Sequence, residues 1–378
     1  MPTATQSSSS TAPTTSKLMM ADPPPEFLTL QEIVITARRN LSPEVWDYIV
    51  GGSDTETTVK RNRNALDRLA FRPRVLRNVE NIDCGGCLLG KDLRLPVLLA
   101  PIGSLQDLES GGGVTVTKAS AEFGTAHMLS SVCKPGLEAV AAAADNPKIF
   151  QLYVRGDADW VDDHVRRAIA NGYFAFCLTV DLDHYGRRER DILKRHMSTS
   201  RQTAAHEEFQ ERLSWDDVKR IKDKFDIPLI LKGIATAEDA RLAIEHGVEG
   251  IYVSNHGGRQ LDCGRGTIDV LPEVVAEVDG RAEIIVDGGF MRGTDIVKAM
   301  ILGADVVGIG RLQGFGAAAG GVRGVVRVLE LLETEIKITL ALLGVTGYDK
   351  LDAGYLKATD AVVEPHALSA FPLLDEGY

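Results

Sequence analysis

The segment SNHGGRQLD, residues 254–262, places His256 and Arg259 three positions apart around two glycines. An imidazole titrates near neutral pH and can remove a proton from a substrate. A guanidinium group binds a carboxylate or a phosphate through paired hydrogen bonds. The same residues could also belong to an ordinary polar surface loop. Their role therefore depends on where the segment lies in the fold and on which other side chains converge there.

Eight short apolar segments recur after residue 95, and amphipathic stretches such as residues 157–172, 214–225 and 236–247 separate most of them. The apolar segments are residues 95–103, 126–131, 148–154, 175–181, 228–234, 250–255, 283–289 and 305–311. Apolar strands that alternate with helices are typical of a parallel sheet buried on both faces. Eight such units predict a (β/α)8 TIM barrel rather than an open sheet.

Polar and ionisable residues gather where these apolar segments end. In a TIM barrel the C-terminal ends of the strands form the active site, so these residues are expected to converge. They are Gln151, Tyr153, Thr179, Asp181, Arg188, Lys232, Ser254, Asn255, His256, Arg259, Asp287, Gly288, Gly289, Gly310 and Arg311. This convergence favours a catalytic site over a surface loop.

Two features predict anions in this site. The glycine turns at residues 287–289 and at Gly310, together with Arg311, are suited to a phosphate at the last two strands. Lys232 lies in the apolar segment LILKGI and needs an anionic partner if it points into the barrel mouth. That partner could be the edge of a reduced flavin, or an internal carboxylate of Asp181 or Asp287, and a Schiff-base lysine is a further alternative.

The flanking regions predict a three-part chain. Residues 1–25 are rich in Ser, Thr and Pro and are expected to form a disordered tail. The barrel domain, with its N-terminal helical extension, is predicted over residues 26–365, and residues 366–378 form a C-terminal tail. Thr29 and Ser42 are typical helix caps of the extension. Residues 190–212 are polar and predict a mobile loop over the barrel mouth.

Net charge and cysteine content limit the kinds of partner, the compartment and the metal sites that we expect for this protein. The 378 residues carry 42 Lys and Arg against 53 Asp and Glu, a net charge of −11, which argues against nucleic acid and anionic membrane surfaces. Five cysteines without a secretory signal favour a reducing, cytoplasmic compartment. The CGGC segment lacks the second cysteine pair of a zinc site, so we predict no metal.

With these motifs in order, the chain resembles the FMN-dependent (S)-2-hydroxy acid oxidase and dehydrogenase family, which includes glycolate oxidase, lactate oxidase, lactate monooxygenase and mandelate dehydrogenase. The resemblance rests on FQLYV, LTVD followed by GRRE, LKGI, SNHGGRQLD, DGGFMRGTD and GIGR, and it spans about residues 27–357. It implies an FMN cofactor, a small 2-hydroxy acid substrate, and O2 or another electron acceptor. It also implies a homo-oligomer, either a tetramer or an octamer.

The resemblance assigns a role to each matching residue. His256 is implied as the base and Asp181 as its orienting partner, Arg188 and Arg259 as carboxylate ligands, and Tyr48 and Tyr153 as contacts of the substrate's polar oxygens. The implied FMN contacts are Ala100, Pro101, Ile102, Gly103, Ser130, Gln151, Thr179, Lys232 and Ser254 at the ring, and Asp287, Gly288, Gly289, Gly310 and Arg311 at the phosphate.

Several positions depart from the common family pattern. APIG replaces APTA at residues 100–103, and Val132 stands where glycolate oxidases tend to have tryptophan, so we expect room for a substrate larger than glycolate. VDLDHYG replaces VDTPRLG at residues 180–186, which puts Tyr185 at a leucine position. Met291 occupies the place of a common phosphate-binding arginine.

Two alternative functions stay open at this point. APIG also occurs in members that resemble lactate monooxygenase, so oxidative decarboxylation is one alternative. Another phosphate-binding barrel enzyme, of the nucleotide dehydrogenase or isomerase kind, is the second. A nucleotide dehydrogenase would need a nucleophilic cysteine in the catalytic loop, for which Cys263 is the nearby candidate.

Overall fold

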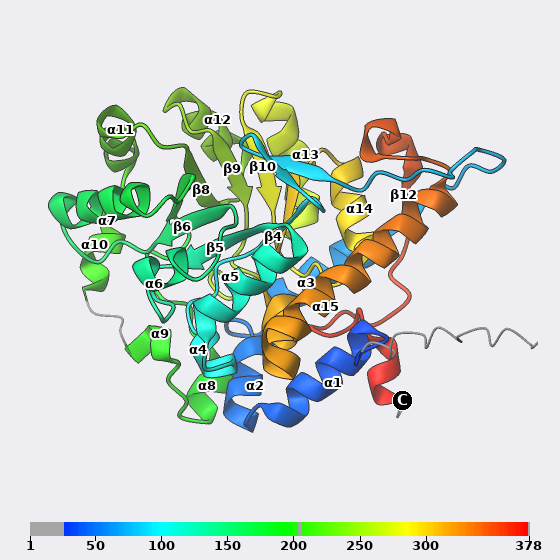
Figure 1. Ribbon diagram of the computed structural model, residues 1–378, viewed down its shortest axis with the longest axis horizontal. Coiled ribbons are helices and arrows are strands. Elements are labelled where there is room, and N and C mark those ends of the chain that lie inside the picture. Colours follow the sequence, from blue (N-terminus) through cyan, green and yellow to red (C-terminus); the bar gives the residue numbers. More distant parts are fainter. Residues whose placement is uncertain (1–25, 203–205, 377–378) are drawn as a thin grey trace, which may run out of the picture.

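The computed structural model describes residues 26–202 and 206–376, and its centre is a closed barrel of eight parallel strands (Figure 1). Each strand pairs in parallel with its neighbours, and β11 closes the ring by pairing with β4. The strands are β4 (Val97–Leu99), β5 (Ala126–Ser130), β6 (Lys148–Leu152), β7 (Ala175–Thr179), β8 (Leu229–Ile234), β9 (Gly250–Val253), β10 (Glu283–Val286) and β11 (Val306–Ile309). The predicted (β/α)8 TIM barrel is confirmed.

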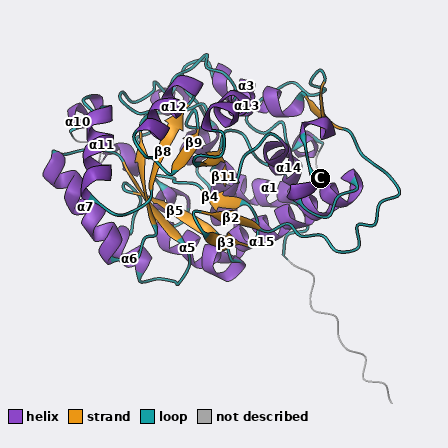
Figure 2. Cartoon of the chain, turned by 90° about the horizontal axis from the view of Figure 1, so that it is seen from above, coloured by secondary structure: helices purple, strands orange, loops and turns teal. Residues whose placement is uncertain are grey.

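Apolar side chains on both faces of the strands explain why the segments are almost continuously hydrophobic. One buried cluster fills the barrel interior and includes Leu98, Met128, Ile149, Ile230 and Ile285. A larger cluster lies between the strands and the surrounding helices. Figure 2 shows the strands at the centre with helices around them. The two clusters are the burial on both faces that the sequence predicts.

Two of the helices around the barrel begin at capping side chains. The Ser214 and Asp217 side chains form a capping box at α11, and the Thr236 hydroxyl accepts a hydrogen bond from the Asp239 amide at α12. The helices are α4 (Leu105–Leu108), α5 (Gly112–Phe123), α6 (Leu137–Ala141), α7 (Ala158–Ala170), α11 (Trp215–Lys224), α12 (Ala237–Glu245), α13 (Thr267–Val278), α14 (Gly293–Ile301) and α15 (Arg311–Leu343). Helix α15 is broken at Gly320 and Gly321, whose backbone angles are not helical.

The N-terminal extension consists of α1 (Leu30–Asn40), α2 (Pro43–Val50) and α3 (Thr57–Asp67). Thr29 and Ser42 cap α1 and α2 as predicted, with side-chain oxygens that accept backbone amides. Helix α1 packs on α15, so the extension is fixed to the barrel. The predicted disordered tail, residues 1–25, lies outside the described residues.

Two small sheets and the C-terminal segment complete the structure. Strands β2 (Gly86–Leu88) and β3 (Lys91–Leu93) form a hairpin, and β1 (Leu69–Phe71) pairs with β12 (Leu356–Ala358). Short 3-10 helices cover Tyr348–Lys350, Ala353–Tyr355 and Pro372–Asp375. The segment predicted as a C-terminal tail packs against the domain, because Phe371 is only 2% exposed.

The insertion after β7, which the sequence predicts as a mobile loop over the barrel mouth, contains short helices. It contains α8 (Glu189–Leu193), α9 (Thr199–Gln202) and α10 (Glu207–Glu211). The Gln210 side chain bonds the amide of Val154 and the carbonyl of Thr179, at 2.7 and 2.9 Å. The short helices escaped prediction because their polar segments lack an apolar period.

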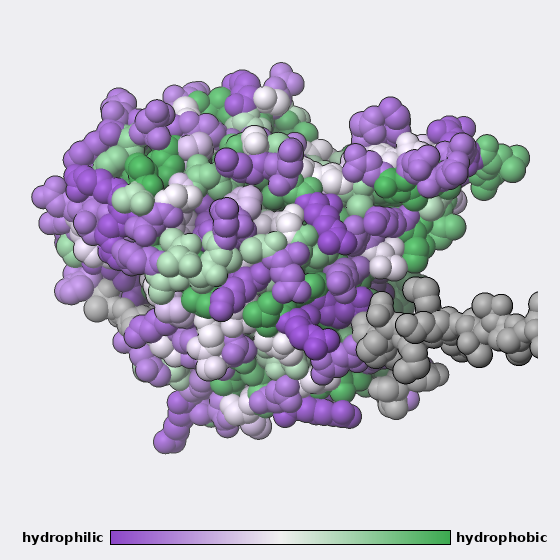
Figure 3. Space-filling view, viewed as in Figure 1, coloured by the Kyte–Doolittle hydropathy of each residue, from purple (hydrophilic) through white to green (hydrophobic). Residues whose placement is uncertain are grey.

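The surface face shown in Figure 3 is mostly polar, with apolar residues at the tip of the loop that Figure 1 draws in light blue. The exposed large apolar side chains include Val75 and Leu76, which are 79% and 102% exposed. Within residues 26–202 and 206–376, no helix combines the length and apolar character needed to cross a bilayer.

Candidate active site

A cavity at the C-terminal end of the barrel collects most of the residues that the sequence assigns to the site. Predicted residues in its wall are Tyr48, Ala100, Pro101, Ile102, Gly103, Tyr153, Arg188, Lys232, His256, Arg259, Asp287, Gly288, Gly289, Gly310 and Arg311. The remaining predicted residues, Ser130, Gln151, Thr179, Asp181 and Ser254, come from the ends of β5, β6, β7 and β9 or directly follow them. The site thus draws on strand ends from around the barrel and on α2.

His256 and Asp181 form the predicted pair. The Nδ1 atom of His256 lies 2.9 Å from Oδ1 of Asp181, and Nε2 lies 3.3 Å from the Tyr153 hydroxyl. The Ser254 hydroxyl accepts the His256 amide at 3.0 Å, and His256 has a φ of 58°, so the turn itself fixes the ring position. This geometry leaves Nε2 as the nitrogen that faces Tyr153 and the cavity.

The charges around this pair keep the imidazole neutral and the carboxylate ionised. Burial lowers the pKa of His256, and the Asp181 carboxylate only partly offsets that effect. Burial alone would raise the pKa of Asp181, but the nearby His256 and Lys232 hold it below its usual value. A neutral imidazole with an anionic partner is the state that can accept a proton.

Two arginines lie beside the pair. Nη1 of Arg259 donates to the carbonyls of Tyr48 and Gly51, at 2.6 and 2.9 Å, and Nε of Arg188 donates to the Arg259 carbonyl at 3.4 Å. Burial, followed by repulsion from Arg188, lowers the pKa of Arg259. A buried cation, Arg188, and a half-buried one, Arg259, lie at one wall without a carboxylate partner among the described residues, which favours an anionic ligand.

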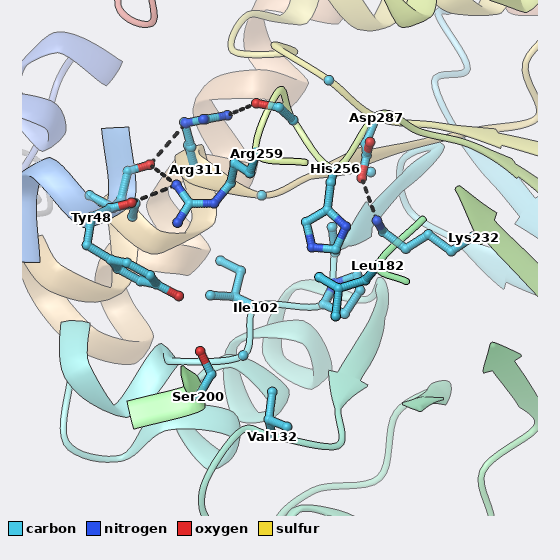
Figure 4. Close-up of a pocket in the computed structure, with 18 of the residues that line it drawn as sticks. Tyr48, Ile102, Val132, Leu182, Ser200, Lys232, His256, Arg259, Asp287 and Arg311 are labelled. Atoms are coloured by element: carbon cyan, nitrogen blue, oxygen red, sulfur yellow. Dashed lines mark hydrogen bonds and ion pairs between the residues drawn. The ribbon is translucent and has the colours of Figure 1, made fainter. Parts of the chain in front are cut away.

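Lys232 forms the floor of the cavity, where it faces Asp287 (Figure 4). Its Nζ is 3.1 Å from the Ser254 hydroxyl and 3.9 Å from Oδ2 of Asp287, and Ser254 donates to Oδ1 of Asp287 at 2.6 Å. Burial alone would lower the pKa of Lys232, but Asp181 and Asp287 raise it above its usual value. The internal ion pair is therefore present, and a protonated amine disfavours the Schiff-base alternative.

The predicted phosphate region contains both glycine turns and Arg311. Gly288 and Gly289 have φ values of 113° and 86°, and no atom lies within 4 Å of the position that a Cβ on Gly310 would take. The Arg311 guanidinium bonds the carbonyls of Ile49, Gly51 and Gly257, at 3.0, 2.8 and 3.0 Å. Burial lowers the pKa of Arg311 to about 9. Sequence could not predict this side-chain direction.

Buried polar atoms without partners show that these residues fit a flavin. The Ser130 hydroxyl and Oε1 of Gln151 are buried and have no hydrogen-bond partner among the described residues, while Nε2 of Gln151 donates to the Thr179 hydroxyl at 2.8 Å. Such atoms are rarely left unpaired in a native protein. A flavin ring edge carries both donors and acceptors, so it can satisfy them.

The structure also brings in residues that the sequence did not assign to the site. Leu182, Tyr185 and Ser200 line the cavity, and Ser200 comes from α9 in the insertion. Ser200 could not be predicted as a site residue, because the polar insertion that contains it has no recognisable apolar period or motif.

Gly103, where the sequence predicts extra space, packs closely against two neighbouring side chains. A Cβ at this position would lie 2.7 Å from Cγ2 of Val132 and 3.1 Å from Cβ of Ser200. Val132 and Ser200 therefore take up the volume left by the missing side chain.

Comparison with known proteins defines the class to which this barrel and site belong. Residues 37–358 match the family model described as FMN-dependent dehydrogenase. Glycolate oxidase 3 of Arabidopsis thaliana is 37% identical over 91% of this chain and 99% of its own length. The L-lactate oxidase of a Nostoc species is 36% identical over 87% of this chain and 98% of its own.

Solved structures agree. A mandelate oxidase crystal structure with (S)-2-phenylpropionate superposes with a TM-score of 0.82 at 35% identity and covers 89% of this chain and 100% of its own. The chain belongs to the family of FMN-dependent 2-hydroxy acid oxidases and dehydrogenases, and it is an FMN-dependent oxidoreductase. The family match settles the class against the other phosphate-binding barrel enzymes.

Proposed function

We propose that this enzyme oxidises an (S)-2-hydroxy acid to the 2-oxo acid, with His256 as the base. The main support is the convergence of three groups at one cavity: the His256–Asp181 pair, the arginines Arg188 and Arg259, and the lysine at the floor. A proton acceptor beside a carboxylate-binding wall matches a substrate whose reacting carbon is bonded directly to its carboxylate.

The residues divide the task as follows. Arg188 and Arg259 bind the substrate carboxylate and thereby fix the α-carbon, while Tyr48 and Tyr153 hydrogen-bond the substrate oxygens. Nε2 of His256 takes up the proton. The Nδ1 proton stays in its hydrogen bond to Asp181, whose charge stabilises the imidazolium that forms.

FMN, when bound, supplies the acceptor for the two electrons that leave the substrate. We propose that Ser130, Gln151, Thr179 and Lys232 hold its ring, with Ala100–Gly103 and Ser254 alongside. The phosphate would meet the backbone of Asp287–Gly289 and Gly310. Arg311 joins the phosphate site only if its guanidinium leaves the carbonyls that it now bonds.

We further propose a substrate with a branched or aromatic side chain, larger than that of glycolate. Support comes from the apolar part of the cavity wall, which contains Ile102, Leu108, Val132 and Leu182. Figure 4 shows Ile102 and Val132 on the side of the cavity away from Arg259 and Arg311. Mandelate oxidase, in the similar solved structures, is seen with (S)-2-phenylpropionate and with benzoyl-formic acid, which have aromatic side chains.

Assembly and compartment are further proposals. We propose a homo-oligomer, a tetramer or an octamer, and the exposed Val75 and Leu76 give such an assembly an apolar contact surface. The cysteines of the described residues are free thiols, which supports a reducing compartment such as the cytoplasm.

A substrate panel tests the proposed reaction. The purified holoenzyme is offered glycolate, (S)-lactate and (S)-mandelate with O2 and with an artificial electron acceptor, and kcat/KM and products are measured. We expect the highest kcat/KM for (S)-mandelate, which has an aromatic side chain, and a 2-oxo acid product. A product one carbon shorter, released with CO2, would instead support the monooxygenase-like alternative that the APIG segment suggests. A preference for glycolate would refute the size proposal.

A further inference from the structure

Tyr185 lies in the segment between β7 and α8, at a position where the family pattern has leucine, and its side chain lines the active-site cavity. Two guanidinium groups bracket its ring: Cζ of Arg188 is 4.2 Å and Cζ of Arg201 is 4.1 Å from the ring centroid. Cation–π contacts at this distance hold guanidinium groups against an aromatic face. Tyr185 therefore directly contacts Arg188, one of the two arginines that are proposed to bind the substrate carboxylate.

The hydroxyl group of Tyr185 provides a second, independent observation. Its oxygen is buried and has no hydrogen-bond partner among the described residues. Tyr185 lines the same cavity as Tyr153 and Arg259, so the phenol lies near the groups that surround the proposed carboxylate position. A buried hydroxyl without a partner beside cations is poised to donate to an anionic ligand.

We propose that Tyr185 is a specificity-determining residue that recognises the substrate carboxylate. Its hydroxyl donates a hydrogen bond to the carboxylate, and its ring holds the guanidinium of Arg188 in place. The inference rests on the proposed function, because it assumes that the cavity binds a 2-hydroxy acid. A leucine at this position offers neither the donor nor the aromatic face.

Arg201 extends the same contact into the insertion. It belongs to α9, which also supplies Ser200 to the cavity wall. The Ser104 and Ser200 hydroxyls lie 2.8 Å apart, and the Thr199 amide donates to Asp107 at 2.8 Å, so α9 is attached to the start of α4. Carboxylate binding at Tyr185 therefore depends in part on the position of α9 at the mouth of the barrel.

The test compares Tyr185→Phe with wild type as FMN-loaded enzymes. Benzoylformate, a 2-oxo acid, is titrated while the flavin absorption spectrum is followed. We expect its Kd to rise about tenfold to a hundredfold, the usual effect of losing a hydrogen bond to a charged group. The Kd of the neutral amide of benzoylformate should rise by a smaller factor, because a hydrogen bond to a neutral carbonyl oxygen is weaker than one to a carboxylate.

Two further variants sharpen the result. Tyr348→Phe is the matched control, since its buried hydroxyl also has no partner among the described residues but does not line the cavity; its benzoylformate Kd should equal that of wild type. Arg201→Gln changes an exposed side chain. It should raise the Kd for benzoylformate by a smaller factor than Tyr185→Phe does, because the Tyr185 hydroxyl is still present.

Two outcomes would overturn the proposal: a benzoylformate Kd in Tyr185→Phe within twofold of wild type, or an equal weakening of acid and amide. If wild type binds FMN but no 2-hydroxy acid reduces it, the proposed function fails instead. The titration still decides the role of Tyr185 in that case.

Discussion

Replacing Asp181 by Asn probes the proton-transfer pair without removing the base. The carboxylate lies 2.9 Å from Nδ1 of His256, both groups are largely buried, and Oδ2 of Asp181 has no other partner among the described residues. The attraction between carboxylate and imidazolium appears only when His256 takes up a proton. Asp181→Asn therefore acts on the transition state and not on substrate binding.

The size of the effect follows from this geometry. Opposite charges about 3–4 Å apart attract by about 4–6 kcal/mol at an effective dielectric constant of about 20. At about 1.4 kcal/mol per factor of ten, flavin reduction should slow by about 10³- to 10⁴-fold. The Asn amide can also donate to Nδ1, which would leave the proton on Nε2 and block the base.

The assay is anaerobic stopped-flow reduction of the bound flavin by the best 2-hydroxy acid, repeated across pH. Burial lowers the pKa of His256 and Asp181 raises it, so the acid limb of the wild-type rate should lie below pH 6.5 and move lower still in Asp181→Asn. Asp183→Asn, two positions along at an exposed acid, is the control and should behave like wild type. A rate for Asp181→Asn within tenfold of wild type, with the same pH profile, would refute the reasoning.

Three more predictions concern other parts of the site. Lys232→Met should lower the midpoint potential of the bound flavin by at least about 30 mV in spectroelectrochemistry, because it removes the buried cation at the cavity floor; an unchanged potential would contradict the assignment. Met291→Arg should lower the Kd for FMN about tenfold in apoenzyme titrations, since it adds a charged donor beside the glycine turn; equal affinities would speak against a phosphate there. Asp262 accepts the amides of Thr55 and Thr58, which hold its pKa well below the usual range. A carboxylate with a lowered folded-state pKa stabilises the protein above its unfolded pKa of about 4 and loses that effect as pH falls. Asp262→Asn should therefore lower the free energy of unfolding by about 1–3 kcal/mol at pH 7, and chemical denaturation should show this difference shrinking below pH 4.

The barrel and the polar strand ends were predictable because both depend on local pattern. Buried parallel strands are apolar on both faces, and residues that follow such strands converge at one end of the barrel. The pairing of His256 with Asp181 followed from that rule together with the family resemblance. The cap residues Thr29, Ser42, Ser214 and Thr236 were equally local signals.

The parts that sequence missed depend on side-chain direction and on packing between distant segments. Arg311 turns to three carbonyls, including that of Ile49 in α2, which no motif encodes. The space beside Gly103 is filled by Val132 and by Ser200, a residue of an insertion without periodicity. A missing side chain therefore does not by itself predict a larger cavity, because neighbouring side chains can occupy the space.

The most direct test of the account is anaerobic mixing of the FMN-loaded enzyme with a series of (S)-2-hydroxy acids, in wild type and in His256→Ala. At least one acid should bleach the wild-type flavin and yield its 2-oxo acid. His256→Ala should retain FMN but reduce it several orders of magnitude more slowly. Equal rates in the two proteins would contradict the role of His256, and a wild-type flavin that no 2-hydroxy acid reduces would contradict the function itself.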